Sequence, residues 1–101
     1  MLSIYRTALG DRLCLEGEVD INSAPGLASA LLALPEGGDV VIDLTDLRFM
    51  DASGVRALVE GSHRLRMTLE SPAPAVRRML ELSRVTELGP VRIAAAQPVL
   101  A

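Results

Sequence analysis

The hydrophobic and polar positions of this chain alternate between strand-like and helix-like periods. Residues 2–9 and 12–19 have the pattern of two strands joined at Gly10-Asp11, where a glycine-first two-residue loop suits a tight hairpin. Residues 39–44 form a continuous apolar run with β-branched residues at its centre, which is typical of a strand covered on both faces. Two further strands are predicted later in the chain, at residues 66–71 and 91–94.

Helices are predicted between these strands. The first begins near Asn22-Ser23-Ala24-Pro25, which offers a capping side chain and a proline in the first turn, where its missing N–H does no harm. Gly54 opens the second, a short helix of about 12 Å that ends near Gly61. The third starts after Pro72 and Pro74. The residues expected to face inward from the three helices follow a helical period: Leu27, Ala30, Leu31 and Leu34, then Val55, Leu58 and Val59, then Val76, Met79, Leu80 and Leu82.

This order of elements predicts a single α/β domain. After the opening hairpin, helices alternate with strands, so right-handed crossovers should give a mixed, mostly parallel sheet of four to five strands with helices packed against it. A chain of 101 residues, 50% of them hydrophobic, can bury one core without metal or disulfide support. We expect the domain to span residues 1–94, followed by a C-terminal tail at residues 95–101.

Composition narrows the classes of function. The formal net charge is −3, and Tyr5 and Phe49 are the only aromatic residues, which argues against nucleic-acid binding because that needs a basic face and stacking rings. No apolar run approaches the ~18 residues of a membrane span, and no leader-like segment opens the chain. The single cysteine, Cys14, cannot form an internal disulfide bond and has the setting of a small apolar residue in a strand. These features predict a cytoplasmic protein.

Polar side chains that could carry chemistry follow the ends of two predicted strands. Asp20 follows the strand at residues 12–19, and Asp51 and Ser53 follow the segment that continues the strand at residues 39–44. Parallel neighbouring strands would bring these ends together, at the edge of an open α/β sheet where ligands and partners usually bind. The unpaired N–H groups of the helix that starts there favour a phosphate or a partner that reads one. From residue types alone, a simple helix cap formed by Asp51 and Ser53 is the alternative.

Other chemistry has little support at these strand ends. A metal site would need more oxygen ligands at fixed spacing than Asp20 and Asp51 supply. Catalysis would need a nucleophile, an oxyanion site or a cofactor motif, and none is evident in the sequence. We therefore expect a protein that is not an enzyme and that uses no metal and no cofactor.

Several ordered segments carry a family resemblance. They are Gly17-Glu18-Val19-Asp20, Val41-Ile42-Asp43-Leu44, Phe49-Met50-Asp51, Pro74-Ala75-Val76-Arg77-Arg78-Met79-Leu80 and Leu82-Ser83-Arg84-Val85. Their order and spacing over about residues 2–93 resemble the STAS domain, the fold of bacterial anti-sigma factor antagonists. The resemblance implies a regulatory module that binds an anti-sigma factor that is also a serine kinase, and so frees a sigma factor.

The resemblance also implies a phosphorylation site, from which this chain departs. The family's pattern is Asp-Ser-(Ser/Thr)-Gly, and the hydroxyl directly after the Asp accepts phosphate; here that position is Ala52. Ser53 matches the second hydroxyl of the pattern and is the remaining candidate acceptor. A phosphoryl group beside Asp51 would add roughly −1.5 to −2 charges and oppose binding through repulsion and desolvation. The missing acceptor favours constitutive binding or a phosphate-independent scaffold over an ordinary phosphorylation switch.

A set of partner-binding residues and a second reading follow from the same resemblance. In a different class of function, the chain would be a structural subunit that docks onto a larger assembly, as the small STAS partners of lipid-transport ATPases do. Either reading is compatible with a homodimer. In the family, the helix after the acidic turn usually runs a turn or more further than predicted here and helps to form the partner-binding face. The expected partner-binding residues are Asp20, Asn22, Asp51, Ala52, Ser53, Gly54 and Arg56.

Overall fold

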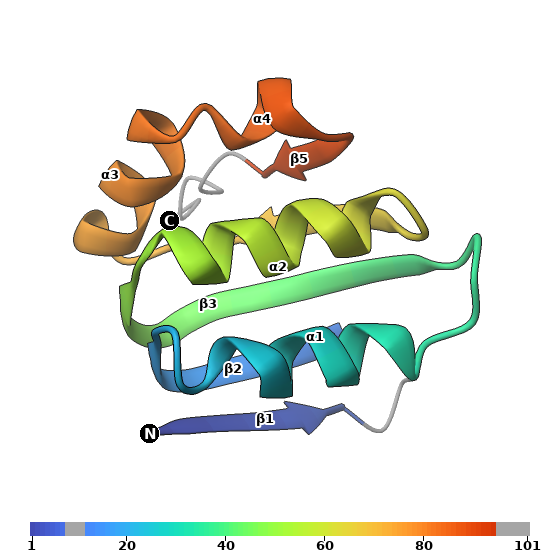
Figure 1. The fold of residues 1–101 in the computed structure, drawn as a ribbon, viewed down its shortest axis with the longest axis horizontal. Helices are drawn as coiled ribbons and strands as arrows, with labels where there is room; N and C mark the ends of the chain where they lie inside the picture. Colours follow the sequence, from blue (N-terminus) through green and yellow to red (C-terminus); the bar gives the residue numbers. More distant parts are fainter. Residues whose placement is uncertain (8–11, 95–101) are drawn as a thin grey trace, which may run out of the picture.

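One mixed sheet and the helices that connect its strands make up the fold (Figure 1). The structure is a computed structural model that describes residues 1–7 and 12–94. Its elements are β1 (Leu2–Arg6), β2 (Arg12–Val19), α1 (Ala24–Leu32), β3 (Asp39–Met50), α2 (Ala52–Ser62), β4 (Arg66–Glu70), α3 (Pro74–Leu82), α4 (Val85–Leu88) and β5 (Val91–Ile93). The turn predicted at Gly10-Asp11 and the tail predicted at residues 95–101 lie outside the described residues.

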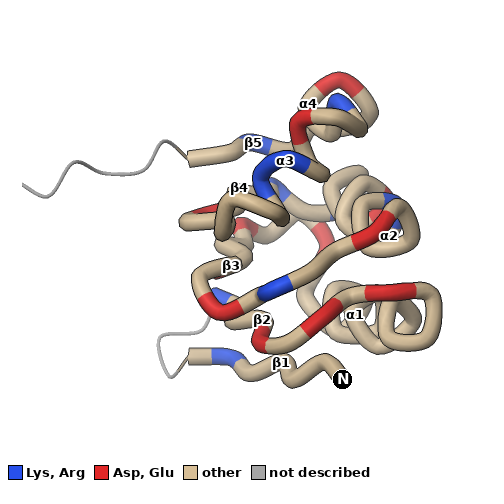
Figure 2. The backbone as a smooth tube through the Cα atoms, turned by 90° about the vertical axis from the view of Figure 1, so that its left-hand side faces the viewer, with Lys and Arg blue, Asp and Glu red and all other residues tan. Residues whose placement is uncertain are grey.

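The sheet has the strand order β1-β2-β3-β4-β5. The first pair, β1 and β2, is antiparallel, and each later pair is parallel. The predicted fold class, a mixed and mostly parallel sheet of four to five strands with helices packed against it, is confirmed. Because each parallel strand lies next to its predecessor, right-handed crossovers place the helices α1, α2 and α4 on one face. Figure 2 shows α1, α2 and α4 on that same side of the strands.

The core lies between this face of the sheet and the helices. Alternate residues of β3 from Val40 to Leu44 are buried, and α1 and α2 cover them with apolar side chains such as Leu27 and Leu58. The intervening residues Val41 and Asp43 are only half-buried. The prediction that this strand is fully covered on both faces is therefore wrong, because the side chains of its second face stay partly exposed.

The open face of the sheet carries an ion-pair network across three strands. The Arg12 guanidinium in β2 lies 2.6 Å from Glu70 Oε1 in β4 and 3.6 Å from Asp43 Oδ2 in β3. Asp43 and Glu70 are register partners, so Arg12 offsets the repulsion between two neighbouring carboxylates. Cys14 lies on the same face, and its burial raises the pKa of the thiol, which fits an unreactive side chain.

The helix that follows the acidic turn is longer than predicted. It begins at Ala52 rather than Gly54 and ends at Ser62, so its 11 residues span about 16 Å. The earlier start has a physical cause, because Asp51 serves as the N-cap and the helix needs no glycine to begin.

The C-terminal third also differs from the predicted pattern. The helix α3 buries Val76 and Leu80, but Leu82 is 72% exposed rather than inward. A short additional helix, α4, follows directly and buries Val85 in place of Leu82. Leu82 lies about 200° around the helix from Leu80, so the helical period itself turns its side chain away from the buried face. The chain then turns between the two helices at Arg84, whose φ is 53°.

Candidate partner-binding site

The parallel register brings Asp20 and Asp51 to the same edge of the sheet. Val19 of β2 pairs with Met50 of β3, and the Asp51 N–H donates to the Val19 carbonyl at 3.1 Å. The next residue along each strand is one of the two carboxylates, as predicted. This edge is the left-hand end of the sheet in Figure 1, where α1 and α2 both begin. Figure 2 looks onto it and shows acidic positions beside the starts of both helices.

Asp51 caps α2 with its carboxylate. Its Oδ1 accepts the Ser53 N–H at 2.9 Å and the Gly54 N–H at 3.4 Å. The Ser53 hydroxyl donates to the same oxygen, so this side chain is turned back toward the cap. Ala52, at the first helical position, is exposed beside it. The cap that residue types alone suggested is therefore present, and it leaves position 52 as the outward-facing one.

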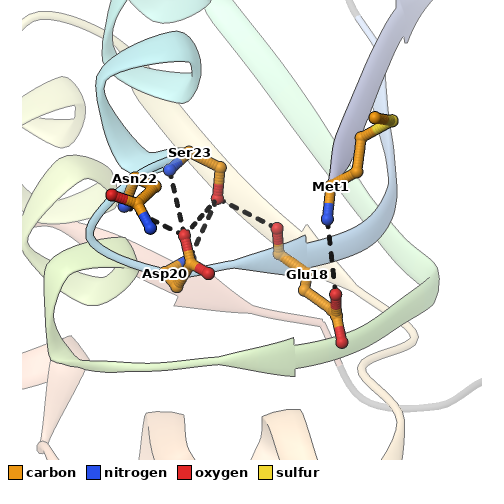
Figure 3. Close-up of polar contacts among 5 residues, drawn as sticks. All are labelled: Met1, Glu18, Asp20, Asn22 and Ser23. Carbon is orange, nitrogen blue, oxygen red and sulfur yellow. Dashed lines mark hydrogen bonds and ion pairs between the residues drawn. The ribbon is translucent and has the colours of Figure 1, made fainter.

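Asp20 organises the turn between β2 and α1 (Figure 3). Its Oδ1 accepts the N–H groups of Asn22 at 2.9 Å and Ser23 at 3.0 Å. The Ser23 hydroxyl donates to the Glu18 carbonyl at 3.0 Å and accepts the Asp20 N–H at 2.9 Å. Because this hydroxyl is engaged with the end of the strand, Ser23 makes no side-chain cap on α1, and the predicted capping side chain is wrong.

These hydrogen bonds make the Asp20 turn sensitive to acid. The Ser23 N–H, followed by the Asn22 N–H and the Ser23 hydroxyl, lowers the pKa of the Asp20 carboxyl. A carboxyl whose pKa is lowered on folding stabilises the folded chain above its unfolded pKa of about 3.9. That contribution is lost as the pH falls through the folded pKa.

An Asp20→Asn variant should remove this dependence, because the amide keeps one acceptor oxygen but does not titrate. The melting temperature of the wild type, measured relative to the variant, should therefore fall between pH 6 and pH 2. A difference in melting temperature that stays constant over this range would contradict the assignment.

Gly54 allows α2 to begin directly against the strand ends. A Cβ atom at this position would lie 2.7 Å from Met50 Cγ and 2.8 Å from Val19 Cγ1, closer than real contacts allow. Gly54 is itself buried, so this predicted partner-binding residue lies beneath the surface and positions the cap above it.

The remaining predicted residues lie around these two turns. Asn22 and Ala52 are exposed, Ser53 is half-buried, and Arg56 is exposed one turn into α2. We call the surface formed by Asp20, Asn22, Asp51, Ala52 and Ser53 the acidic edge.

Sequence reasoning missed two apolar side chains beside the acidic edge. Ile21 is 75% exposed in the β2–α1 turn, and Phe49 is 47% exposed near the end of β3. The signal for Ile21 was available, since it is an apolar residue between two polar turn residues with no period to bring it inward. Large apolar side chains exposed next to carboxylates are typical of surfaces that contact another protein.

Neither a metal-binding cluster nor a helix able to span a membrane occurs in the described part of the chain. Across residues 1–7 and 12–94, no three His, Cys, Asp or Glu side chains are grouped so that they could hold a metal ion. None of the helices over the same residues has both the length and the apolar character needed to cross a membrane.

Comparisons with known proteins connect this arrangement to a family. A family model described as "Mlab, STAS domain" matches residues 5–92. The comparison with curated proteins finds no match. Among solved structures, an anti-sigma factor antagonist from Mycobacterium paratuberculosis is similar with a TM-score of 0.72 and 23% identity, over 91% of this chain and 84% of that one.

Two further structures share the fold. The anti-sigma factor antagonist SpoIIAA in its unphosphorylated form has a TM-score of 0.59 and 20% identity, over 94% of this chain and 89% of that one. An anti-sigma-factor antagonist (STAS) domain protein from Planctomyces limnophilus has a TM-score of 0.65 and 19% identity, over 95% and 92%. The family model spans most of the chain, and the chain therefore belongs to the STAS domain family.

Proposed function

We propose that this chain is a regulatory binding module of the anti-sigma factor antagonist type, which binds a kinase-type anti-sigma factor through the acidic edge. The observation that carries the proposal is the β2–β3 register, which brings the half-buried Asp20 and Asp51 to the same end of the sheet. Solved structures with this fold include proteins named as anti-sigma factor antagonists. The apolar Ile21 and Phe49 beside the edge would add contact area to the charged centre.

We further propose that the module binds without a phosphorylation switch. The position that follows Asp51 is Ala52, which has no hydroxyl to accept phosphate. The neighbouring Ser53 hydroxyl donates to the Asp51 carboxylate and would have to leave this bond to receive a phosphoryl group. Ser53 is therefore a poor acceptor, and the unmodified edge stays competent to bind.

A second candidate function is a docking subunit of a larger assembly such as a lipid-transport ATPase. The observation that favours it is the description of the matching family model, which names Mlab rather than an antagonist. The absence of an acceptor at Ala52 suits a permanent subunit as well as a fixed antagonist. A binding test distinguishes the two candidates. The chain is mixed separately with a purified kinase-type anti-sigma factor and with a purified ATPase subunit from the same genome, and the protein that binds identifies the function.

Replacing Asp51 with Ala should weaken the binding of the partner by more than it weakens folding. Loss of the cap costs about 1 kcal/mol of unfolding free energy. Binding should fall about tenfold or more, since a carboxylate at the centre of the edge is also removed. Titration calorimetry gives the affinity, and a thermal melt of the same variant gives the stability.

A matched control for Asp51→Ala is Glu36→Ala. Glu36 is an exposed carboxylate in the loop between α1 and β3, at the end of the sheet away from the acidic edge. The Glu36→Ala variant should leave the affinity for the partner unchanged. Equal losses of affinity in the two variants would mean that net charge, rather than the acidic edge, determines binding.

A further inference from the structure

A small groove continues the acidic edge along α2. It has a volume of about 330 Å³ and runs between α2 and the corner that joins α3 to α4. The apolar side chains of Ala52, Val55 and Val59 line it along α2, and Leu88 closes it from α4. We call it the α2–α4 groove. Ala52 belongs to both surfaces, so the groove opens directly from the acidic edge.

Several side chains that line this groove are exposed to solvent in the isolated chain. Leu88 is 56% exposed although Val85, in the same short helix, is 1% exposed. Arg56 and Glu60 stand one turn apart on the wall that α2 forms, and both are exposed. Within residues 1–7 and 12–94, neither of the two side chains takes part in an ion pair. An apolar floor beside one exposed cation and one exposed anion suits a partner of mixed character.

We propose that the α2–α4 groove receives one face of an amphipathic helix from the partner that binds the acidic edge. This helix would place apolar side chains one turn apart against Val59 and Leu88, with an acidic residue toward Arg56 and a basic residue toward Glu60. The inference rests on the proposed function, because it takes the occupant from the same partner. The α2 wall from Ala52 to Val59 is about 10 Å long, which spans two helical turns of an occupant.

The walls of the groove favour a helix over an extended segment. An extended segment needs backbone partners, which it finds at a free sheet edge. The long wall of the α2–α4 groove is α2, whose central backbone groups are bonded within the helix, and the residues that line the groove include none from a strand. A helical occupant satisfies its own backbone and presents only side chains, which is what this groove can accept.

The identity of residue 52 matters for the same reason. Ala52 keeps the mouth of the groove apolar. A phosphoryl group at this position would bring roughly −1.5 to −2 charges to the point where the apolar surface begins. The alanine therefore does more than remove an acceptor, because it extends the apolar floor to the acidic edge.

Two exposed leucines provide a matched test. Leu88 lines the groove, whereas Leu82, which is 72% exposed on α3, does not. Leu88→Ser should lower the affinity for the purified anti-sigma factor about tenfold or more, and Leu82→Ser should change it less than about twofold. Both side chains are exposed, so both variants should fold, which amide NMR spectra check.

The outcomes separate the groove from the acidic edge. If Asp51→Ala lowers the affinity for the partner but Leu88→Ser changes it no more than Leu82→Ser does, the groove proposal is overturned and the proposed function stands. If the wild type binds no kinase-type anti-sigma factor, the proposed function fails and the groove proposal fails with it.

A second measurement needs no partner protein. Indole, used as a small apolar probe, should shift the NMR signals of the Val59 and Leu88 methyl groups in a saturable way and leave those of Leu82 unchanged. Selective shifts support an apolar binding groove. Shifts of equal size at Leu82 and Leu88, or no shift at either, would overturn it whatever the partner experiment shows.

Discussion

Incubated with ATP and a kinase-type anti-sigma factor, an Ala52→Ser variant should take up about one phosphate per chain, whereas the wild type should take up little or none. The new hydroxyl would stand at the exposed first position of α2, outside the Asp51 cap. The wild-type Ser53 hydroxyl is held by Asp51 instead. Transfer to the variant would place roughly −1.5 to −2 charges beside Asp51, so its binding should become sensitive to ATP. Mass spectrometry of the intact protein measures the uptake directly.

A double variant separates the two candidate acceptors. Ala52→Ser combined with Ser53→Ala should still be phosphorylated, and its affinity should fall with added ATP as in the single variant. Stoichiometric phosphate on Ser53 of the wild type would show that the acceptor has moved by one residue, and the fixed-state proposal would be wrong.

Two helical glycines should respond to the same substitution with opposite signs. Gly26 and Gly54 each occupy the third position of a helix. A Cβ atom at Gly26 would meet nothing within 4 Å, so Gly26→Ala should stabilise the chain by about 0.5–1 kcal/mol through helix propensity. A Cβ atom at Gly54 would lie 2.8 Å from Val19 Cγ1, so Gly54→Ala should destabilise the chain by about 1–3 kcal/mol.

Urea denaturation followed by circular dichroism gives both free energies of unfolding. The Gly54→Ala variant should also lose partner affinity, because pushing α2 outward shifts Asp51 relative to Asp20. A stabilised Gly54→Ala variant would mean that the helix start moves freely over the strand ends. In that case the register would not hold the geometry of the acidic edge.

The fold and the acidic edge were accessible from the sequence because they depend on local patterns. Alternating or continuous runs of apolar residues marked the strands, and the order of strands and helices left few topologies open. Once β2 and β3 are parallel neighbours, the positions of Asp20 and Asp51 follow from the residues that precede them. The register shifts in this strand pair then bring the two carboxylates level, because Val19 comes to pair with Met50.

The features that could not be predicted depend on tertiary contacts. β3 advances three residues while β2 advances two between Cys14 and Glu16, and such irregularities shift which side chains face the core. The next buried residue after Leu44 is therefore Leu47, three residues further on, whereas a regular strand would bury every second residue. The burial of Val85 depends on the turn at Arg84, which no local pattern in the sequence predicts.

The α2–α4 groove could not be predicted from the sequence either. Leu88 and Val59 are far apart along the chain and meet only because α4 packs beside α2. Neither residue belongs to a motif, and their apolar character alone would assign both to the core. Only the packed structure distinguishes a leucine that closes a groove from one that fills an interior.

The strand order has a consequence for how the protein is made. Each strand pairs with the one that precedes it in the sequence, so the sheet grows at a single edge in the direction of synthesis. The opening hairpin can form as soon as it leaves the ribosome, and each later strand then adds to an edge that already exists. Among β1 to β5, no strand has to wait for a distant C-terminal partner or insert between two others. A nascent chain therefore leaves unpaired the outer edge of β1 and the edge of its newest strand, and no interior strand waits with both edges open, which limits its exposure to aggregation during translation.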